Sequence, residues 1–254
     1  MTTVAVLSDI HGVRPALEAV LAEPDVVAAD RVVLTGDIVS GPQPAQVMER
    51  LLDLGDRAVW VRGNADREVV ETADGKHSQH AETVWAARSL SDKHVDVLRR
   101  LPHPLTLPVG GFGEVMFCHG SPRDDDEVVL VDTRVGRWRE ALAYVPDDVR
   151  TLACGHTHMP FQRLVAGRLV VNPGSVGMPY GRAGAHWALL DGRAPGGVVQ
   201  LRVSSYDIPA AVEEVAGCGM PGAREWAEEF LTAANSDVDA LTAFGPRDGR
   251  AAHG

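Results

Sequence analysis

Short apolar runs alternate with polar stretches along the chain. Five runs are three or four residues long, partly β-branched and bounded by glycine or polar residues, which favours buried strands over helices. They lie at residues 4–7, 32–34, 59–61, 115–118 and 152–154. Helical spacing of apolar residues fills residues 15–22 and 44–54, and each of these stretches has a proline suited to a first helical turn.

The spacing of the first three runs predicts a parallel sheet. Asp9 and Asp37, which follow the first two runs, are 28 positions apart, and Asn64 comes 27 positions after Asp37. A strand–helix–strand unit takes about 30 residues. The first 64 residues are therefore predicted to form two consecutive βαβ units.

The pattern changes in the second half of the chain. Residues 77–101 are rich in helix formers and predict one or two helices. Runs separated by Gly or Pro turns then predict antiparallel strands at residues 105–109, 161–165, 169–171, 186–190 and 198–203. Helices are predicted at 207–215 and 223–231. We interpret residues 1–234 as a single α/β domain and residues 235–254, which are small and polar, as a flexible tail.

Composition narrows the function classes. The chain has 254 residues, 45% of them hydrophobic, which is enough for one sizeable core. Its formal net charge of -11 repels phosphate backbones, so we do not expect bulk nucleic-acid binding. Bound metal ions could still dominate the charge of a local site.

Cysteine content and hydropathy indicate the cellular compartment in which the protein is expected. Cys118, Cys154 and Cys218 give no C-x-x-C pair and no disulfide framework, which favours a reducing environment. No export signal or membrane-length apolar segment is evident, so we expect a cytoplasmic protein without membrane contact.

Potential metal ligands follow all five apolar runs. Since ligands bind beyond the carboxyl ends of strands in open α/β sheets, these residues are predicted to converge. The seven candidates are Asp9, His11, Asp37, Asn64, His119, His156 and His158. Asp9 with His11, and His156 with His158, are spaced i, i+2 and would point to the same side of an extended segment.

Seven donors exceed the needs of one tetrahedral ion and suit two ions that share a bridging carboxylate. Mixed oxygen and imidazole ligands fit Mn, Fe or Zn. Taken singly, Asp9 or Asp37 could cap a helix, Asn64 could sit in a turn and His119 could be structural. Their occurrence after five successive runs favours the metal site.

The motifs resemble those of the calcineurin-like metallophosphoesterases. Asp9-x-His11, Gly36-Asp37, Gly63-Asn64, His119 and Gly155-His156-x-His158 occur in that family's order, and the resemblance covers about residues 4–190. The stretch 172–177 also resembles bacterial single-domain phosphoesterases and phosphodiesterases. The resemblance implies a four-layer α/β/β/α sandwich with two mixed sheets.

The resemblance also implies roles for the ligands. One metal ion would take Asp9, His11 and His158, and the other would take Asn64, His119 and His156. Asp37 would bridge the two ions. With Asp37, Asn64 and His119 as catalytic residues, the expected reaction is hydrolysis of a small phosphoester by a metal-activated hydroxide.

One position departs from the family pattern. Many members have a histidine after the motif asparagine, thought to protonate the leaving group, whereas this chain has Ala65. A methyl group donates no proton, so we expect phosphodiesters or activated esters to be preferred over alkyl phosphomonoesters. The alternative is a binding or scaffold protein on the same fold with little catalysis.

Residues near the motifs are candidates for substrate binding or support. Arg123, Tyr180 and Arg182 follow motif segments and are predicted to face the substrate. Asp66 either supports a ligand or caps a helix. The remaining predicted helix and loop histidines, including His103, are interpreted as surface or structural residues. The sequence leaves the physiological substrate, the native metal and the oligomeric state open.

Overall fold

Two mixed five-stranded sheets form the centre of the protein, in a computed structural model that describes residues 1–249. The first sheet has the order β10 (Val198–Ser204), β9 (Ala185–Asp191), β1 (Thr3–Leu7), β2 (Arg31–Leu34), β3 (Ala58–Trp60). The second has the order β4 (Leu105–Val109), β5 (Gly113–Phe117), β6 (Thr151–Ala153), β8 (Arg168–Asn172), β7 (Phe161–Val165).

The parallel part of each sheet carries the predicted metal-ligand motifs. Strands β1, β2 and β3 are parallel, which confirms the two predicted βαβ units. Strands β5, β6 and β8 are also parallel. The flanking strands β4, β7, β9 and β10 pair antiparallel. The prediction for β8 was incomplete, because this strand pairs parallel with β6 and antiparallel with β7.

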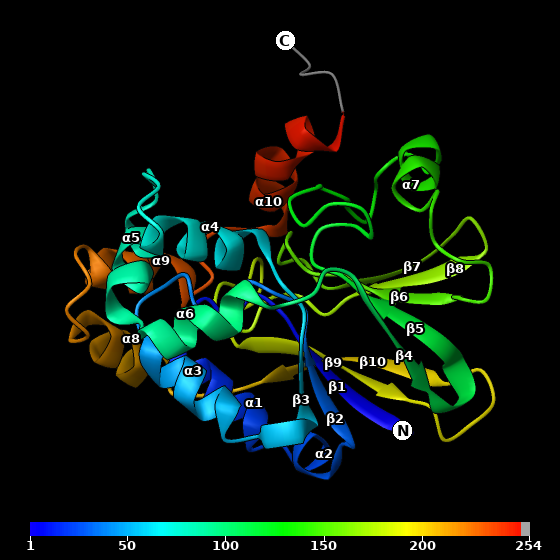
Figure 1. The fold of residues 1–254 in the computed structure, drawn as a ribbon, viewed down its shortest axis with the longest axis horizontal. Helices are drawn as coiled ribbons and strands as arrows, with labels where there is room; N and C mark the ends of the chain where they lie inside the picture. Colours follow the sequence, from blue (N-terminus) through cyan, green and yellow to red (C-terminus); the bar gives the residue numbers. More distant parts are fainter. Residues whose placement is uncertain (250–254) are drawn as a thin grey trace.

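Helices cover the outer face of the first sheet (Figure 1). Those before β4 are α1 (Arg14–Leu21), α2 (Pro24–Ala28), α3 (Pro44–Leu52), α4 (Asn64–Ala73), α5 (Ala81–Ser89) and α6 (Asp92–Arg99). After β10 come α8 (Ile208–Ala216) and α9 (Ala223–Phe230). Residues 77–101 thus contain two helices. Helices α2, α4 and α7 (Val135–Ala141) were not predicted.

Alternating side chains of the strands fill separate cores. In β1, Val4 and Val6 pack between the two sheets, whereas Ala5 and Leu7 pack against the helices. Trp138 of α7 packs with apolar residues on the outer face of the second sheet. Because both faces of the central strands are buried, they read as continuous apolar runs. The result is the predicted four-layer α/β/β/α sandwich, with α7 in its last layer (Figure 1).

The C-terminal segment differs from the prediction of a flexible tail. Residues Asp237–Phe244 form helix α10 and Gly245–Asp248 form a 3-10 turn. Ala240 is fully buried, and a capping box between Ser236 and Asp239 starts the helix. The sequence pattern missed it because one small buried side chain gives little helical periodicity. Residues 250–254, the rest of the predicted tail, lie outside the described residues.

Among residues 1–249, no helix is both long enough and apolar enough to cross a bilayer.

Candidate metal centre

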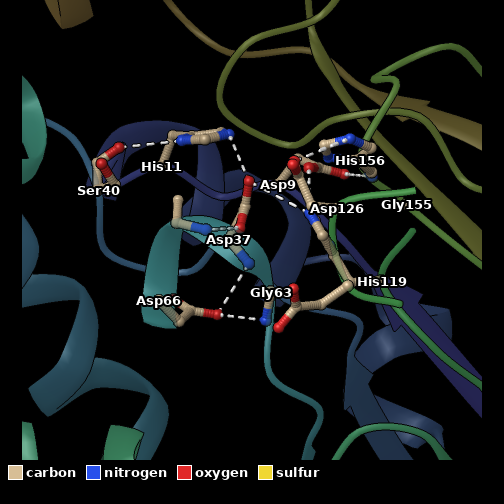
Figure 2. Close-up of polar contacts among 12 residues, drawn as sticks. Asp9, His11, Asp37, Ser40, Gly63, Asp66, His119, Asp126, Gly155 and His156 are labelled. Carbon is tan, nitrogen blue, oxygen red and sulfur yellow. Dashed lines mark hydrogen bonds and ion pairs between the residues drawn. The ribbon is translucent and has the colours of Figure 1, made fainter. Parts of the chain in front are cut away.

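The structure brings the candidate ligands together at the carboxyl ends of five strands. Asp9 and His11 follow β1, Asp37 follows β2, and Asn64 begins α4 after β3. The remaining ligands come from the second sheet: His119 follows β5, and His156 and His158 follow β6. Figure 2 shows side chains from both sheets meeting in one place.

The buried carboxylates and imidazoles form two adjacent clusters. Asp9, His11 and His158 have ligand atoms within 4.8 Å of one another, and so do Asp37, His119 and His156. The Oδ2 atom of Asp37 lies 3.2 Å from His119 Nε2 in its own cluster and 3.7 Å from His11 Nε2 in the other. The Asp37 carboxylate is thus between the clusters.

Backbone carbonyls orient three of the four imidazoles. Each of these rings donates its Nδ1 proton to a carbonyl oxygen and turns its Nε2 atom inward, as metal-binding histidines do. The pairs are His11 with Ser40 O at 2.9 Å, His119 with Thr35 O at 2.7 Å and His158 with Met178 O at 2.9 Å.

The inward atoms fit a cation. With Nδ1 as the donor, His11 and His158 aim two Nε2 lone pairs at each other across 3.2 Å. Such lone pairs repel unless a proton or a metal ion lies with them. Buried polar atoms without a hydrogen-bond partner in the described structure also include Asp9 Oδ1, Asn64 Oδ1, His119 Nε2 and His156 Nε2. The donors therefore suit bound metal ions.

The local electrostatics favour positive charge. Burial lowers the pKa of His119, but the Asp37 and Asp9 carboxylates outweigh burial and raise it to about 10. Burial likewise opposes the charged form of Asp37, yet the surrounding histidines hold its pKa below the usual range. A field that retains a proton on a buried imidazole also attracts a divalent cation.

Five of the seven candidate ligands have an unusual backbone conformation. Asp9, His11, Asp37, His156 and His158 all have positive φ, between 47° and 68°. Residues with a Cβ adopt this region at a cost of about 1–2 kcal/mol each, and such strain clusters at functional sites. Surrounding contacts must therefore hold these turns.

Asp66 supplies one such contact, because it both supports a candidate ligand, Asp37, and caps α4. Its Oδ2 accepts from the backbone N–H of Asp37 and of Gly63, each at 2.9 Å (Figure 2). Its Oδ1 accepts from Ile38 N at 2.8 Å. Burial and the nearby Asp37 charge raise the pKa of Asp66 to about 7.

Two glycines let the chain approach the carboxylates closely. A Cβ at Gly63 would lie 2.2 Å from Asp37 Oδ1, and one at Gly155 would lie 1.9 Å from Ser8 Oγ and 2.8 Å from Asp9 Oδ2. The glycines of the Gly63-Asn64 and Gly155-His156 motifs are therefore required by space.

A cavity of about 360 Å³ opens onto the clusters. Ala65 lies on its wall, with its N–H donating to Asp37 Oδ1 at 2.8 Å and only a methyl group facing the cavity. The cavity is lined by His11, Asp37, Ser40, Asn64, Ala65, Glu68, His80, Glu82, Thr83, Asp126, Met178 and Arg247.

The three predicted substrate residues differ in position. The Tyr180 ring lies 6.0 Å from the His158 ring, beside the first cluster. Arg182, together with Tyr180, lines a second cavity of about 560 Å³ and not the metal-centre cavity. Arg123 pairs with Glu127, to which its Nε donates at 2.8 Å, and does not line the metal-centre cavity.

Sequence reasoning missed several neighbours of the site. Among them, Asp126 and Arg247 line the cavity, and the Phe244 ring lies 5.8 Å from the His156 ring. None of these three residues lies in a ligand-type motif, so no sequence signal identified them. His103, interpreted as a surface or structural residue, has a structural contact: its Nε2 atom accepts a hydrogen bond from His119 N at 3.1 Å, which helps to fix that loop.

Comparison with known proteins identifies the family. Residues 2–194 match the calcineurin-like phosphoesterase superfamily domain, and the chain belongs to this superfamily. It is 27% identical to the uncharacterized protein MJ0912 of Methanocaldococcus jannaschii over 252 residues, covering 90% of this chain and 96% of that protein. It is 28% identical to the phosphodiesterase YfcE of Escherichia coli over 193 residues, covering 72% and 84%.

The fold is shared with a solved structure. The hypothetical protein PH1004 from Pyrococcus horikoshii superposes with a TM-score of 0.78 at 22% identity, covering 93% of this chain and all of that chain. This likeness supports the four-layer architecture derived from the strand order.

Proposed function

We propose that this protein is a dinuclear metal-dependent phosphoester hydrolase that favours phosphodiesters or activated esters over alkyl phosphomonoesters. The observation that carries the proposal is the pair of buried Asp/His clusters with Asp37 between them and inward Nε2 atoms. We assign Asp9, His11 and His158 to one ion and Asn64, His119 and His156 to the other. Asp37 bridges them.

The protein residues of this site bind and orient the reacting groups. Two divalent ions of Mn, Fe or Zn would activate a water and neutralise the phosphoryl oxygens. The carbonyls of Thr35, Ser40 and Met178 keep the imidazole Nε2 atoms directed inward. Burial of the ligands excludes bulk water and strengthens their interaction with the phosphoryl group.

The preference for diesters follows from Ala65. The residue lines the cavity beside Asn64 and carries no proton donor. Protonation of the leaving group matters most when the departing oxygen is a basic alkoxide, where general acid catalysis contributes about 10²–10⁴-fold. Esters with acidic leaving groups depend less on such a donor. The E. coli relative named as a phosphodiesterase agrees with this preference.

The test combines metal analysis with turnover. We expect purified protein to retain two ions per chain and to hydrolyse an aryl phosphodiester faster than an alkyl phosphomonoester with added Mn²⁺. Asp37→Asn should lose most of the activity and part of the metal, while Asp53→Asn, at an exposed position after α3, should not. Normal turnover by Asp37→Asn with two ions bound would contradict the bridging role, and inactive metal-loaded wild type would favour a scaffold protein.

A further inference from the structure

The C-terminal segment, residues 236–249, lies against the candidate metal centre. The Phe244 ring is 5.8 Å from the His156 ring and 6.4 Å from the Tyr180 ring, which itself lies 6.0 Å from His158. Figure 1 shows α10 in red between α4 and the side of the molecule that carries α7. The segment therefore contributes to the wall of the site.

Arg247, which belongs to the same C-terminal segment, lines the metal-centre cavity. Its Nη2 atom donates to Asp126 Oδ1 at 2.6 Å and to Asp126 O at 2.9 Å. The same Asp126 Oδ1 is 3.7 Å from His156 Nε2. Arg247 and Asp126 both line the cavity with His11, Asp37 and Asn64. The Arg247 side chain lines the cavity and is 46% exposed, so protein atoms do not fully enclose it.

Arg247 is a basic side chain in a cavity whose other charged side chains are carboxylates. Within the described structure, Arg247 is the only lysine or arginine of the lining, which also contains the carboxylates of Asp37, Glu68, Glu82 and Asp126. These carboxylates repel a phosphate group, and Glu68 and Glu82 are not among the candidate metal ligands. A guanidinium binds phosphate oxygens through two parallel N–H donors, which suits it to this position.

Resting on the proposed function, we propose that Arg247 binds a non-bridging phosphate oxygen of the substrate. Asp126 holds the guanidinium at the cavity wall before substrate arrives. The arginine exchanges its contact with the Asp126 carboxylate for one with the phosphate and keeps its hydrogen bond to the Asp126 carbonyl. The C-terminal segment is thus part of the substrate site.

The segment has anchors that do not involve Arg247. Thr133 Oγ1 donates to Asp248 Oδ1 at 2.6 Å, and Arg134 Nη2 donates to the carbonyl of Gly249 at 2.7 Å. Neither Thr133 nor Arg134 lines the cavity. Arg134→Gln is therefore a matched control, since it removes an arginine contact to the same segment away from the site.

The test measures phosphate binding as well as turnover in the full-length, metal-loaded protein. Arg247→Gln should raise both KM and the Kd for inorganic phosphate, measured by calorimetry, by about 10- to 100-fold, as expected for loss of a charged hydrogen-bonding partner. Arg247→Lys should recover part of the loss. Arg134→Gln should match wild type, and Asp126→Asn should bind phosphate at least as tightly as wild type. Metal content should be equal throughout.

Two results would overturn the inference alone: unchanged phosphate Kd in Arg247→Gln, or the same rise in Arg134→Gln and Asp126→Asn, which would mean that Arg247 only fastens the segment. Wild-type protein that neither retains metal nor hydrolyses a phosphoester would overturn the proposed function and this inference with it.

Discussion

Asp66 offers a sharp test of how the metal centre is held. Its carboxylate accepts three backbone hydrogen bonds, from Asp37, Ile38 and Gly63, and is fully buried. Asp37, with φ of 53°, is held in a strained turn by these bonds. The substitution Asp66→Asn preserves size and shape but turns one of the two acceptor atoms into a donor.

The three hydrogen bonds of Asp66 determine how much free energy of unfolding the substitution removes. The less costly orientation keeps an oxygen for Asp37 N and Gly63 N and places the amide nitrogen against Ile38 N. Above the Asp66 pKa of about 7, where the carboxylate is charged, one buried N–H then loses its acceptor and the other two lose a charged one, so the free energy of unfolding should fall by about 2–4 kcal/mol. For a chain of this size, this lowers Tm by about 5–15 °C. Metal affinity should fall about 10- to 100-fold because the loop that carries Asp37 is loosened.

The assay is calorimetric melting together with metal analysis at fixed free metal. Asp239 is the control, because it occupies the same third helical position in α10, where it accepts from Ser236 N at 2.8 Å on the protein surface. Asp239→Asn should cost about 0.5–1 kcal/mol, as for an exposed cap, and leave the metal bound. If Asp66→Asn behaves like Asp239→Asn in both measurements, Asp66 is only a helix cap.

Three further predictions concern the metal and the shape of the site. Chelation should lower Tm by about 5–10 °C in calorimetry, as expected for a ligand present at 100 times its Kd, and an unchanged Tm would argue against resident metal. Gly155→Ala should destabilise the protein and weaken metal binding, because its Cβ would lie 1.9 Å from Ser8 Oγ; Gly136→Ala, in a helix with open space, should be neutral or stabilising in the same denaturation and metal assays. Ala65→His should raise alkyl monoesterase turnover relative to aryl diesterase turnover at equal metal occupancy, and a wild type that already prefers the alkyl ester would refute the argument from Ala65.

The sequence was sufficient for the strands and for the residues that follow them. Strand ends are local signals, since Asp9-x-His11 and Gly155-His156-x-His158 each follow a short apolar run. Parallel pairing brings such ends together within each sheet, and the packing of the two sheets against each other brings the two sets together. The pattern could not show the positive φ of Asp9 or Asp37, because that conformation depends on contacts from distant backbone.

Sequence patterns could not predict the contacts that hold the candidate ligands, for a similar reason. The oxygen atoms that orient His11, His119 and His158 belong to the main chain, so residue type carries no signal for them. Asp66 was ambiguous between two roles because its position in α4 explains the cap, whereas its bonds to Asp37 and Ile38 join residues 28 or 29 positions apart.

The mixture of ligand types in the proposed centre would also allow an acidic protein to attract an anionic substrate. Asp9 and Asp37 are the only charged members of the proposed ligand set when the histidines are neutral, and Asn64 is uncharged. Two divalent ions would therefore leave the centre with a net charge of about +2, whereas four carboxylates in place of the histidines would cancel it to about -2. Neutral imidazoles thus preserve the attraction for phosphate that a net charge of -11 opposes over the rest of the surface. On this argument, replacing a ligand histidine by aspartate should weaken phosphate binding even in a variant that retains both ions.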